Sequence, residues 1–294
     1  MRRKIDTVKS LIRSQPGLLQ CPLCEAGLAL TEPNSVACPQ GHTFDLARTG
    51  YLNLLPSRKG DQKYTKALFE ARSAVYQRGL YEGVVQPIAE AAAGWAKEQG
   101  AGEIRILDLG CGEGSHLWNV ASQIAGGSIE VLAVGVDIAK EGIQVAARNY
   151  PGPLWCVGDL AKAPFAPGQF HVLLNIFSPA NYREFARLMA PEGLVIKVVP
   201  GERYLEEVRL ALHGEGAEAG EGDAAFLFAQ HFAEVSTVEV QYRAAVDAND
   251  LPALVEMTPL SWQASPERKE AFVQSGLEAV TIDVAVLIGR RPLA

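Results

Sequence analysis

The 294-residue sequence lacks the marks of a membrane protein or a secreted one. No stretch approaches the roughly 18 apolar residues of a membrane span, and the basic start Met1–Asp6 has no apolar run behind it, as a secretion signal requires. The sequence has only five cysteines, and this odd number indicates reduced thiols rather than a set of disulfides. The sequence therefore predicts a cytoplasmic globular protein that makes no contact with a membrane.

Two widespread nucleotide-binding signatures are absent as well. The dinucleotide fingerprint G-x-G-x-x-G needs glycine at position 115, which is Ser115, and no G-x-x-x-x-G-K-[ST] run is present. The sequence instead contains Asp108-Leu-Gly-Cys-Gly-Glu-Gly114, which directly follows the mainly apolar run Ile104–Leu107. Because glycine has no Cβ, the backbone can turn tightly after a buried strand. It can also come close to a bound ligand. A glycine-rich turn without a ligand is the alternative at this point.

The D-x-G-x-G-x-G run resembles the first motif of class I S-adenosylmethionine (SAM) methyltransferases. The resemblance implies SAM as the cofactor, with contacts from Asp108, Gly110, Gly112, Glu113 and Gly114. A second apolar strand ends at Asp137, where a carboxylate accepts hydrogen bonds from both ribose hydroxyls in doubly wound folds. Asp159 follows a third strand, where SAM enzymes hold the adenine amino group. Asn175 lies near the end of a fourth, beside the expected transfer site, and is also predicted to contact the cofactor.

Strand and helix patterns alternate along this part of the chain. Apolar runs predict strands near 104–109, 130–136, 153–158, 170–176 and 194–199. Helical spacing predicts helices near 84–95, 114–125, 139–149, 180–190 and 203–213. The alternation requires a parallel sheet with helices on both faces. Late strands near 232–241 and 280–289 fit the antiparallel hairpin that closes the sheet of SAM methyltransferases. The predicted fold is α/β, Rossmann-like and doubly wound, with a mostly parallel seven-stranded sheet.

Four potential metal ligands lie near the N-terminus, as C-x2-C, a gap of thirteen residues and C-x3-H. They are Cys21, Cys24, Cys38 and His42. Three thiolates and an imidazole complete a closed tetrahedral zinc site that leaves no position for water, so the zinc is predicted to be structural. Free thiols and a redox C-x-x-C are the alternatives, although the latter does not explain Cys38 and His42. The remaining histidines have no ligand spacing.

The net charge of −7 conceals an uneven distribution. Residues 1–80 hold 12 Lys and Arg against 6 Asp and Glu, whereas residues 81–294 hold 15 against 28. Basic surface attracts polyanions, so nucleic acid is predicted to dock on the N-terminal part, with chance variation as the alternative. Aromatic residues among the cations between Arg48 and Arg78 are typical of RNA-binding segments. The cations predicted to lead toward the cofactor pocket are Arg58, Lys59, Lys63 and Lys66.

These features divide the chain into three parts. Residues 1–50 are predicted to form an N-terminal helix, ending at Pro16-Gly17, and a zinc-finger module. Residues 51–80 are a basic bridging segment, and residues 81–294 are the SAM-dependent methyltransferase domain. A segment of ~40 residues rarely builds a core of its own, so we expect the metal to hold the module together.

The chain as a whole resembles the RlmA-type 23S rRNA guanine-N1 methyltransferases. The resemblance rests on the four-ligand finger, on the run His42–Pro56 that follows it, on the glycine motif and on Pro200–Leu205. The runs Tyr64–Arg72 and Asn175–Asn181 are more similar to the Gram-positive subclass linked with macrolide resistance.

The resemblance to that family implies a substrate and further cofactor contacts. The partner is 23S rRNA, methylated at guanine N1 in the loop of hairpin 35, and Tyr81 and Tyr204 also contact SAM; a homodimer is left open. The N1 proton must leave during transfer. Asn181 would orient the base and Asp61 would accept the proton, but both are more simply ordinary loop residues. The catalytic residue therefore stays unknown.

Two other functions are compatible with parts of the sequence. One is SAM-dependent methylation of a small molecule, with a finger that serves only folding or dimerisation. The basic N-terminal third argues against this function. The other is a zinc-containing RNA-binding protein with a vestigial SAM pocket. The joint presence of Asp108, the three glycines, Asp137 and Asp159 argues against that one.

Overall fold

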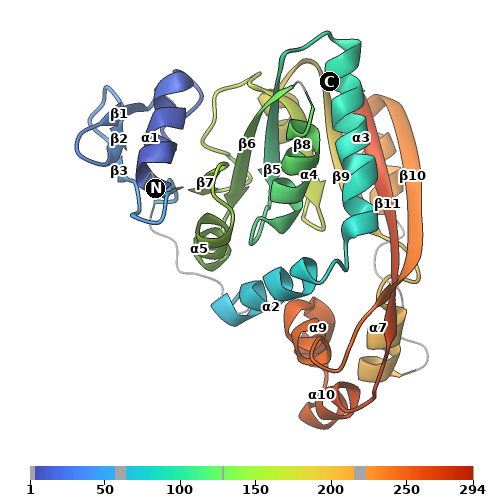
Figure 1. Ribbon diagram of the computed structural model, residues 1–294. Coiled ribbons are helices and arrows are strands. Elements are labelled where there is room, and N and C mark those ends of the chain that lie inside the picture. Colours follow the sequence, from blue (N-terminus) through green and yellow to red (C-terminus); the bar gives the residue numbers. More distant parts are fainter. Residues whose placement is uncertain (1–3, 57–63, 128, 215–222, 294) are drawn as a thin grey trace.

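One eight-stranded sheet forms the centre of the protein (Figure 1). The computed structural model describes residues 4–56, 64–127, 129–214 and 223–293. The strand order is β10-β11-β9-β8-β5-β6-β7-β4. Strand β11 is antiparallel to both β9 and β10, whereas the pairs from β9 to β4 are parallel. The strands are β4 (Tyr51–Asn53), β5 (Glu103–Leu109), β6 (Glu130–Asp137), β7 (Leu154–Val157), β8 (Phe170–Ile176), β9 (Met189–Pro200), β10 (Phe232–Ala245) and β11 (Ala279–Pro292).

Strand β4 is the difference from the predicted seven-stranded sheet. It pairs in parallel with β7, with Tyr51 opposite Trp155, and the Leu54 N–H donates to Val157 O at 2.8 Å. A three-residue strand is too short for its periodicity to be recognised in the sequence, and its partner lies far along the chain. The other seven strands are those predicted, and the order reverses between β5 and β8, where doubly wound folds bind their ligands.

Helices cover both faces of the sheet. The helices α3 (Glu82–Glu98), α4 (Ser115–Ala125) and α5 (Lys140–Asn149) share one core, and α6 (Tyr182–Leu188) and α8 (Ala224–Ala229) contribute to a second. Strand β5 supplies both cores because its side chains alternate: Ile104 and Ile106 belong to the first and Leu107 and Leu109 to the second.

A further group of helices lies beyond the carboxyl ends of the parallel strands (Figure 1). It consists of α2 (Lys66–Gln77), α7 (Glu206–His213), α9 (Leu251–Met257), the 3₁₀ helix η1 (Pro259–Gln263) and α10 (Pro266–Val273). Helix α2 packs against α9 and α5. The sequence had indicated α7 but no helix between residues 246 and 278.

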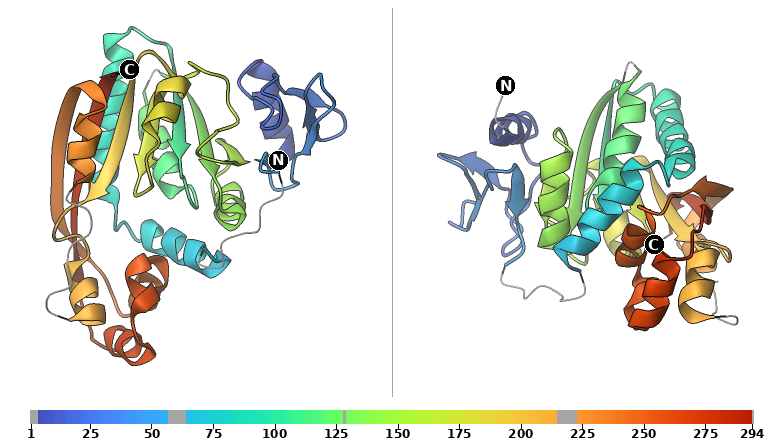
Figure 2. Two further views of the ribbon diagram at one scale, coloured as in Figure 1. Left: turned by 180° about the vertical axis from the view of Figure 1, so that it is seen from behind. Right: turned by 60° about the horizontal axis from the view of Figure 1, so that its bottom comes forward.

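The N-terminal module consists of helix α1 (Lys4–Ser14) and a small antiparallel sheet of β1 (Ala29–Thr31), β2 (Ser35–Ala37) and β3 (Thr43–Asp45). Helix α1 buries Ile5, Val8 and Ile12 and ends before Pro16, as its sequence predicts. The views from behind and from below place the module beside the sheet edge that carries β4 and β7 (Figure 2). Within the described ranges no helix is long and apolar enough to cross a membrane.

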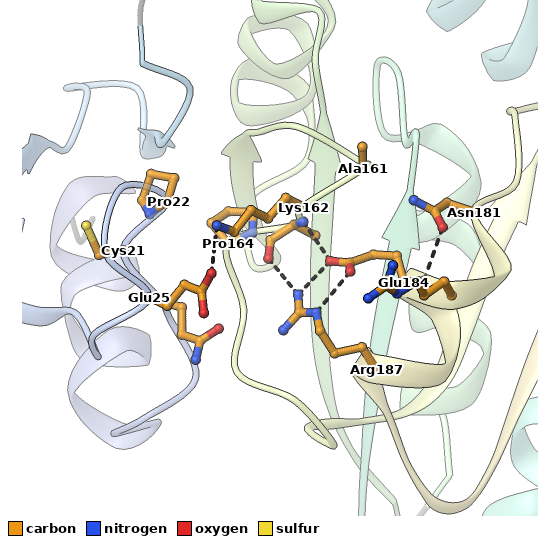
Figure 3. A pocket seen from close by; sticks show the side chains of 12 residues that line it. Cys21, Pro22, Glu25, Ala161, Lys162, Pro164, Asn181, Glu184 and Arg187 are labelled. Carbon is orange, nitrogen blue, oxygen red and sulfur yellow. Dashed lines mark hydrogen bonds and ion pairs between the residues drawn. The ribbon is translucent and has the colours of Figure 1, made fainter. Parts of the chain in front are cut away.

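Backbone hydrogen bonds join the module to the large domain. The Gln20 N–H donates to Pro164 O at 2.9 Å, and the Ala166 N–H donates to Leu18 O at 3.0 Å. The side chain of Glu25 pairs with Lys162 at 2.7 Å (Figure 3). These contacts fix the module on the loop that follows β7.

Candidate cofactor and zinc sites

The glycine turn after β5 adopts a backbone that side chains rarely allow. Gly110, Gly112 and Gly114 have φ of 88°, 55° and 86°, in the left-handed region. A Cβ on Gly110 would lie 2.0 Å from the Ser178 hydroxyl oxygen, and one on Gly114 would lie 2.6 Å from the Trp155 ring. Both the conformation and the close packing therefore require glycine in this turn.

Asp137 ties the glycine turn to the end of β6. One carboxylate oxygen accepts from the Gly112 N–H at 2.8 Å, and the other accepts from the Ala139 N–H at 2.7 Å. Burial raises the pKa of Asp137, and the two backbone donors act in the opposite direction. The half-buried carboxylate thus lies beside the turn, at the position predicted for the ribose contact.

Asp108 is a buried carboxyl group with an unsatisfied oxygen. The residue is 1% exposed, and its Oδ1 has no hydrogen-bond partner among the described residues. Burial, followed by the charges of Asp137 and Glu113, raises the pKa of Asp108 well above its ordinary value. A buried acceptor of this kind calls for a donor or a cation that the protein itself does not supply.

Glu113 is the third carboxyl group of the turn. It accepts a 2.6 Å hydrogen bond from the Ser115 hydroxyl, which also lies 2.8 Å from the phenol oxygen of Tyr150. Burial raises the pKa of Glu113 to about 7, although the bond from Ser115 opposes the shift. Three acidic groups therefore surround the glycine turn, which fits a ligand that carries positive charge.

Asp159 and Asn175 follow the neighbouring strands β7 and β8. Asp159 is half-buried and accepts from the Ala161 N–H at 2.9 Å. The Asn175 amide is fully buried and donates to Leu109 O and Pro179 O, both at 3.1 Å, so both of its N–H groups are engaged within the protein. Asn175 therefore fixes the loop after β8 against the end of β5.

Lys197 completes the network beneath this loop. Its ammonium group donates to the Asn175 side-chain oxygen at 2.6 Å and to Ser178 O at 2.9 Å. Asn181 ends the loop and caps α6, since its side-chain oxygen accepts from the Glu184 N–H at 3.2 Å. The Asn181 side chain is thus used structurally, while Asp61, Arg58, Lys59 and Lys63 lie outside the described residues.

Aromatic side chains gather where the loop after β8 meets the start of α3. The phenol oxygens of Tyr81 and Tyr204, which the family resemblance had selected, lie 2.7 Å apart. The Phe177 ring lies 5.2 Å from that of Tyr204 and 6.0 Å from that of Tyr81. Phe177 has a φ of 50° and is 36% exposed. A bulky residue in this conformation costs ~1–3 kcal/mol, which its surroundings must compensate.

Sequence reasoning had given His116 no role, yet it lies in this group. Its ring is 4.8 Å from Tyr76 and 5.3 Å from Tyr81, and its Nδ1 has no partner within the described residues. Burial, with the nearby charge of Arg72, lowers the pKa of His116 to about 3, which keeps the imidazole neutral. His116 lies in no motif, and Phe177 lies in the family-like run Asn175–Asn181 but was given no role of its own. The remaining signal was their position directly after the glycine turn and strand β8.

The four predicted zinc ligands converge in the N-terminal module. Their ligand atoms all lie within 4.8 Å of one another. The Cys24 and Cys38 sulfurs are 3.6 Å apart, and His42 Nδ1 lies 3.4 and 3.5 Å from the sulfurs of Cys38 and Cys21. A tetrahedral zinc ion with bonds of about 2.3 Å to sulfur and about 2.0 Å to nitrogen would place these atoms ~3.5–3.8 Å apart. The four residues fit a closed zinc site.

A cavity of ≈ 540 Å³ lies elsewhere, between the N-terminal module and α6 (Figure 3). Most of its charged groups are paired: Glu25 binds Lys162, and Glu184 binds Arg187 at 2.5 Å. Arg187 also donates to Phe165 O and Ala163 O at 2.8 and 2.9 Å. The Glu184–Arg187 ion pair thus holds the loop on which the module docks. It is separate from the carboxyl groups of the glycine turn.

Comparisons with known proteins match the two parts of the chain that carry these sites. The family model described as RlmA, N-terminal, matches residues 19–63, and the one described as a methyltransferase domain matches residues 106–193. YxjB of Bacillus subtilis (strain 168), named as a candidate 23S rRNA (guanine-N1)-methyltransferase, is 36% identical over 93% of this chain and 97% of its own length.

Two further relatives match along nearly the whole chain. A Micromonospora griseorubida protein with the same candidate activity is 30% identical over 94% of this chain and 97% of its own. The 23S rRNA (guanine(748)-N1)-methyltransferase of Streptomyces fradiae is 31% identical over 92% of this chain and 96% of its own length. The chain belongs to the 23S rRNA (guanine-N1)-methyltransferase family. It is therefore a SAM-dependent methyltransferase with a zinc ribbon, and the predicted family, fold class and cofactors are confirmed.

Proposed function

We propose that this protein transfers a methyl group from SAM to N1 of a guanine in the loop of hairpin 35 of 23S rRNA. The observation that carries the proposal is the similarity to three relatives over more than nine tenths of the chain, all named for guanine N1 of 23S rRNA. The similarity includes the zinc ribbon, and the fold alone would serve many substrates. The Streptomyces fradiae name gives position 748 for that protein, and the hairpin follows from the family resemblance.

The cofactor residues have separate tasks in this proposal. Asp137 accepts hydrogen bonds from the ribose hydroxyls, and Asp159 accepts from the adenine amino group. The buried carboxyl groups Asp108 and Glu113 offset the positive charges of the ligand, next to the open backbone of Gly110, Gly112 and Gly114. Tyr81 and Tyr204 border the methionine end of the site as a hydrogen-bonded pair.

Bound SAM supplies an electrophilic methyl group, and the protein aligns the guanine with it. Phe177 offers a partly exposed ring on which a splayed-out base can stack. Asn175 and Lys197 hold the loop that carries this ring, so they position it without contacting the base. Alignment of this kind supplies much of the rate of a direct transfer, and no catalytic base is assigned.

The N-terminal third supplies the RNA contacts in this proposal. Residues 1–50 form the ribbon module, residues 51–80 the basic bridge and residues 81–294 the methyltransferase domain. Because the last part carries 28 acidic against 15 basic residues, a polyanion would dock on the basic first 80 residues. The cytoplasm is the proposed compartment, where ribosomal RNA is found.

Reverse-transcription mapping of rRNA from cells with and without this protein tests the proposal. Methylation at N1 blocks Watson–Crick pairing and stops the polymerase. We expect a stop at one guanine in the hairpin 35 loop, lost in the deletion strain and restored by the wild-type gene. Identical stop patterns in both strains would contradict the proposal.

A further inference from the structure

Helix α2 covers the glycine turn at the carboxyl edge of the sheet. A Cβ built on Gly112 would lie 3.5 Å from the Phe69 ring and 4.0 Å from Arg72 Nη1. Phe69 is 1% exposed and packs still more closely over Gly142, near the start of α5, where a Cβ would lie 2.9 Å from its ring. The two side chains of α2 thus reach the backbone that approaches the cofactor.

The Arg72 side chain is held in place from two directions. Its Nε donates to Met257 O, at the end of α9, at 3.0 Å. Its guanidinium carbon lies 5.6 Å from the centre of the Phe69 ring, within the range of a cation–π contact. Among the described residues, no hydrogen bond joins the two terminal nitrogens to the protein, so one edge of the guanidinium fork remains available.

The charge of Arg72 acts inside the site. Burial raises the pKa of Glu113 and of Asp137, and the positive charge of Arg72 partly counteracts both shifts. The second cation near the turn, Lys197, is committed to Asn175 and to Ser178 O. Among the described residues, Arg72 thus lies close to Gly112 and has terminal N–H donors that no protein group uses.

The charges of SAM require such a cation. The ligand carries a sulfonium and an ammonium group, which suit Asp108, Glu113 and Asp137, but it also carries a carboxylate that these residues repel. A guanidinium group binds a carboxylate through two parallel hydrogen bonds and keeps its charge at every relevant pH. We propose that Arg72 binds the carboxylate of the methionine part of SAM. The inference rests on the cofactor site proposed above.

Two ligands that differ in this carboxylate test the assignment. S-Adenosylhomocysteine has the complete amino-acid tail, whereas 5′-methylthioadenosine keeps the nucleoside thioether and lacks the tail. Calorimetric titration of full-length, zinc-loaded protein should show that Arg72→Ala weakens adenosylhomocysteine binding by ~10–100-fold, the usual effect of losing a hydrogen-bonded charge. Methylthioadenosine binding should change less than about twofold, because this ligand has no carboxylate to lose. Retained binding of methylthioadenosine also shows that the variant is folded.

Arg78→Ala, at the C-cap of the same helix, provides the matched control. Arg78 pairs with Asp247 and Asp250 at 3.4 and 3.5 Å and is largely exposed, so both affinities should stay at the wild-type level. Equal weakening of both ligands by Arg72→Ala would show a structural role and overturn the proposal. Unchanged affinities would also overturn it, and would point to an RNA phosphate instead. Failure of the wild-type protein to bind adenosylhomocysteine would reject the cofactor site itself.

Discussion

The phenol oxygens of Tyr81 and Tyr204 lie 2.7 Å apart, although the two residues precede different helices, α3 and α7. Burial raises the pKa of both tyrosines, so both stay protonated and share one hydrogen bond. The Phe177 ring packs beside the pair, 5.2 Å from the ring of Tyr204. In the proposed cofactor site, the methionine end would therefore depend on residues that precede two different helices.

Tyr204→Phe should weaken SAM binding by about fivefold, because an ordinary hydrogen bond contributes ~1 kcal/mol and its loss leaves the Tyr81 hydroxyl unpaired. Isothermal titration with SAM measures the effect. Tyr182→Phe, which makes the same change in α6, is the control and should leave the affinity unaltered. If Tyr204→Phe binds SAM with the wild-type affinity, the hydrogen bond between the two tyrosines does not contribute to the cofactor site.

Gly112→Val should abolish SAM binding. The residue has a φ of 55°, which a β-branched side chain adopts only with strain of ~1–3 kcal/mol, and the new methyl groups would fill the path of the ligand. Gly94→Ala is the matched control, since a Cβ at this position in α3 meets no atom within 4 Å. That variant should bind SAM normally. Normal binding by Gly112→Val would refute the assignment of the glycine turn.

The stability of the ligand-free protein should fall as the pH rises from about 4.5 to about 7. Burial raises the pKa of Glu113 from 4.5 to about 7, so between these values the folded state holds a proton that the unfolded state has released. The contribution amounts to roughly 3 kcal/mol when it is complete.

Urea unfolding at several pH values measures this dependence. Glu113→Gln should remove the part of the pH dependence of the free energy of unfolding that comes from Glu113. Glu130→Gln, which replaces an exposed carboxyl group on β6, should retain that part. If wild type and Glu113→Gln lose stability equally over this range, Glu113 is not the group that titrates.

Metal analysis of freshly purified protein should return one zinc ion per chain. Cys38→Ser should lower the zinc content and loosen the N-terminal module, since its ligand atoms are gathered within 4.8 Å. SAM affinity should change little, because the glycine turn belongs to a different part of the fold. A zinc content far below one equivalent in reduced protein, or complete loss of SAM binding in the variant, would contradict this division of roles.

Much of the fold follows from local patterns in the sequence. The strands that end at Leu109, Asp137 and Val157 are short apolar runs that lead into a glycine or end in a carboxylate, and parallel pairing brings their ends to one edge. Strand β4 and helices α8, α9 and α10 were not predicted; β4 has only three residues and pairs with β7, which lies far along the chain.

The candidate site was predictable only in part, for a similar reason. The glycine turn, Asp137 and the zinc ligands are defined by spacing along the chain. Arg72 and His116 acquire their surroundings from tertiary packing: Arg72 depends on Met257 and His116 on Tyr76. Helical spacing places both residues on helices, but it does not reveal which neighbouring element they contact.

Methyl transfer in vitro tests the central claim most directly. Purified protein is incubated with labelled SAM and a hairpin 35 transcript, and the product is mapped by reverse transcription. The same protein is also offered a cell extract freed of RNA. We expect label at N1 of one loop guanine, and this labelling should fall steeply with salt as phosphate contacts require. Label on a small metabolite with none on the RNA would contradict it.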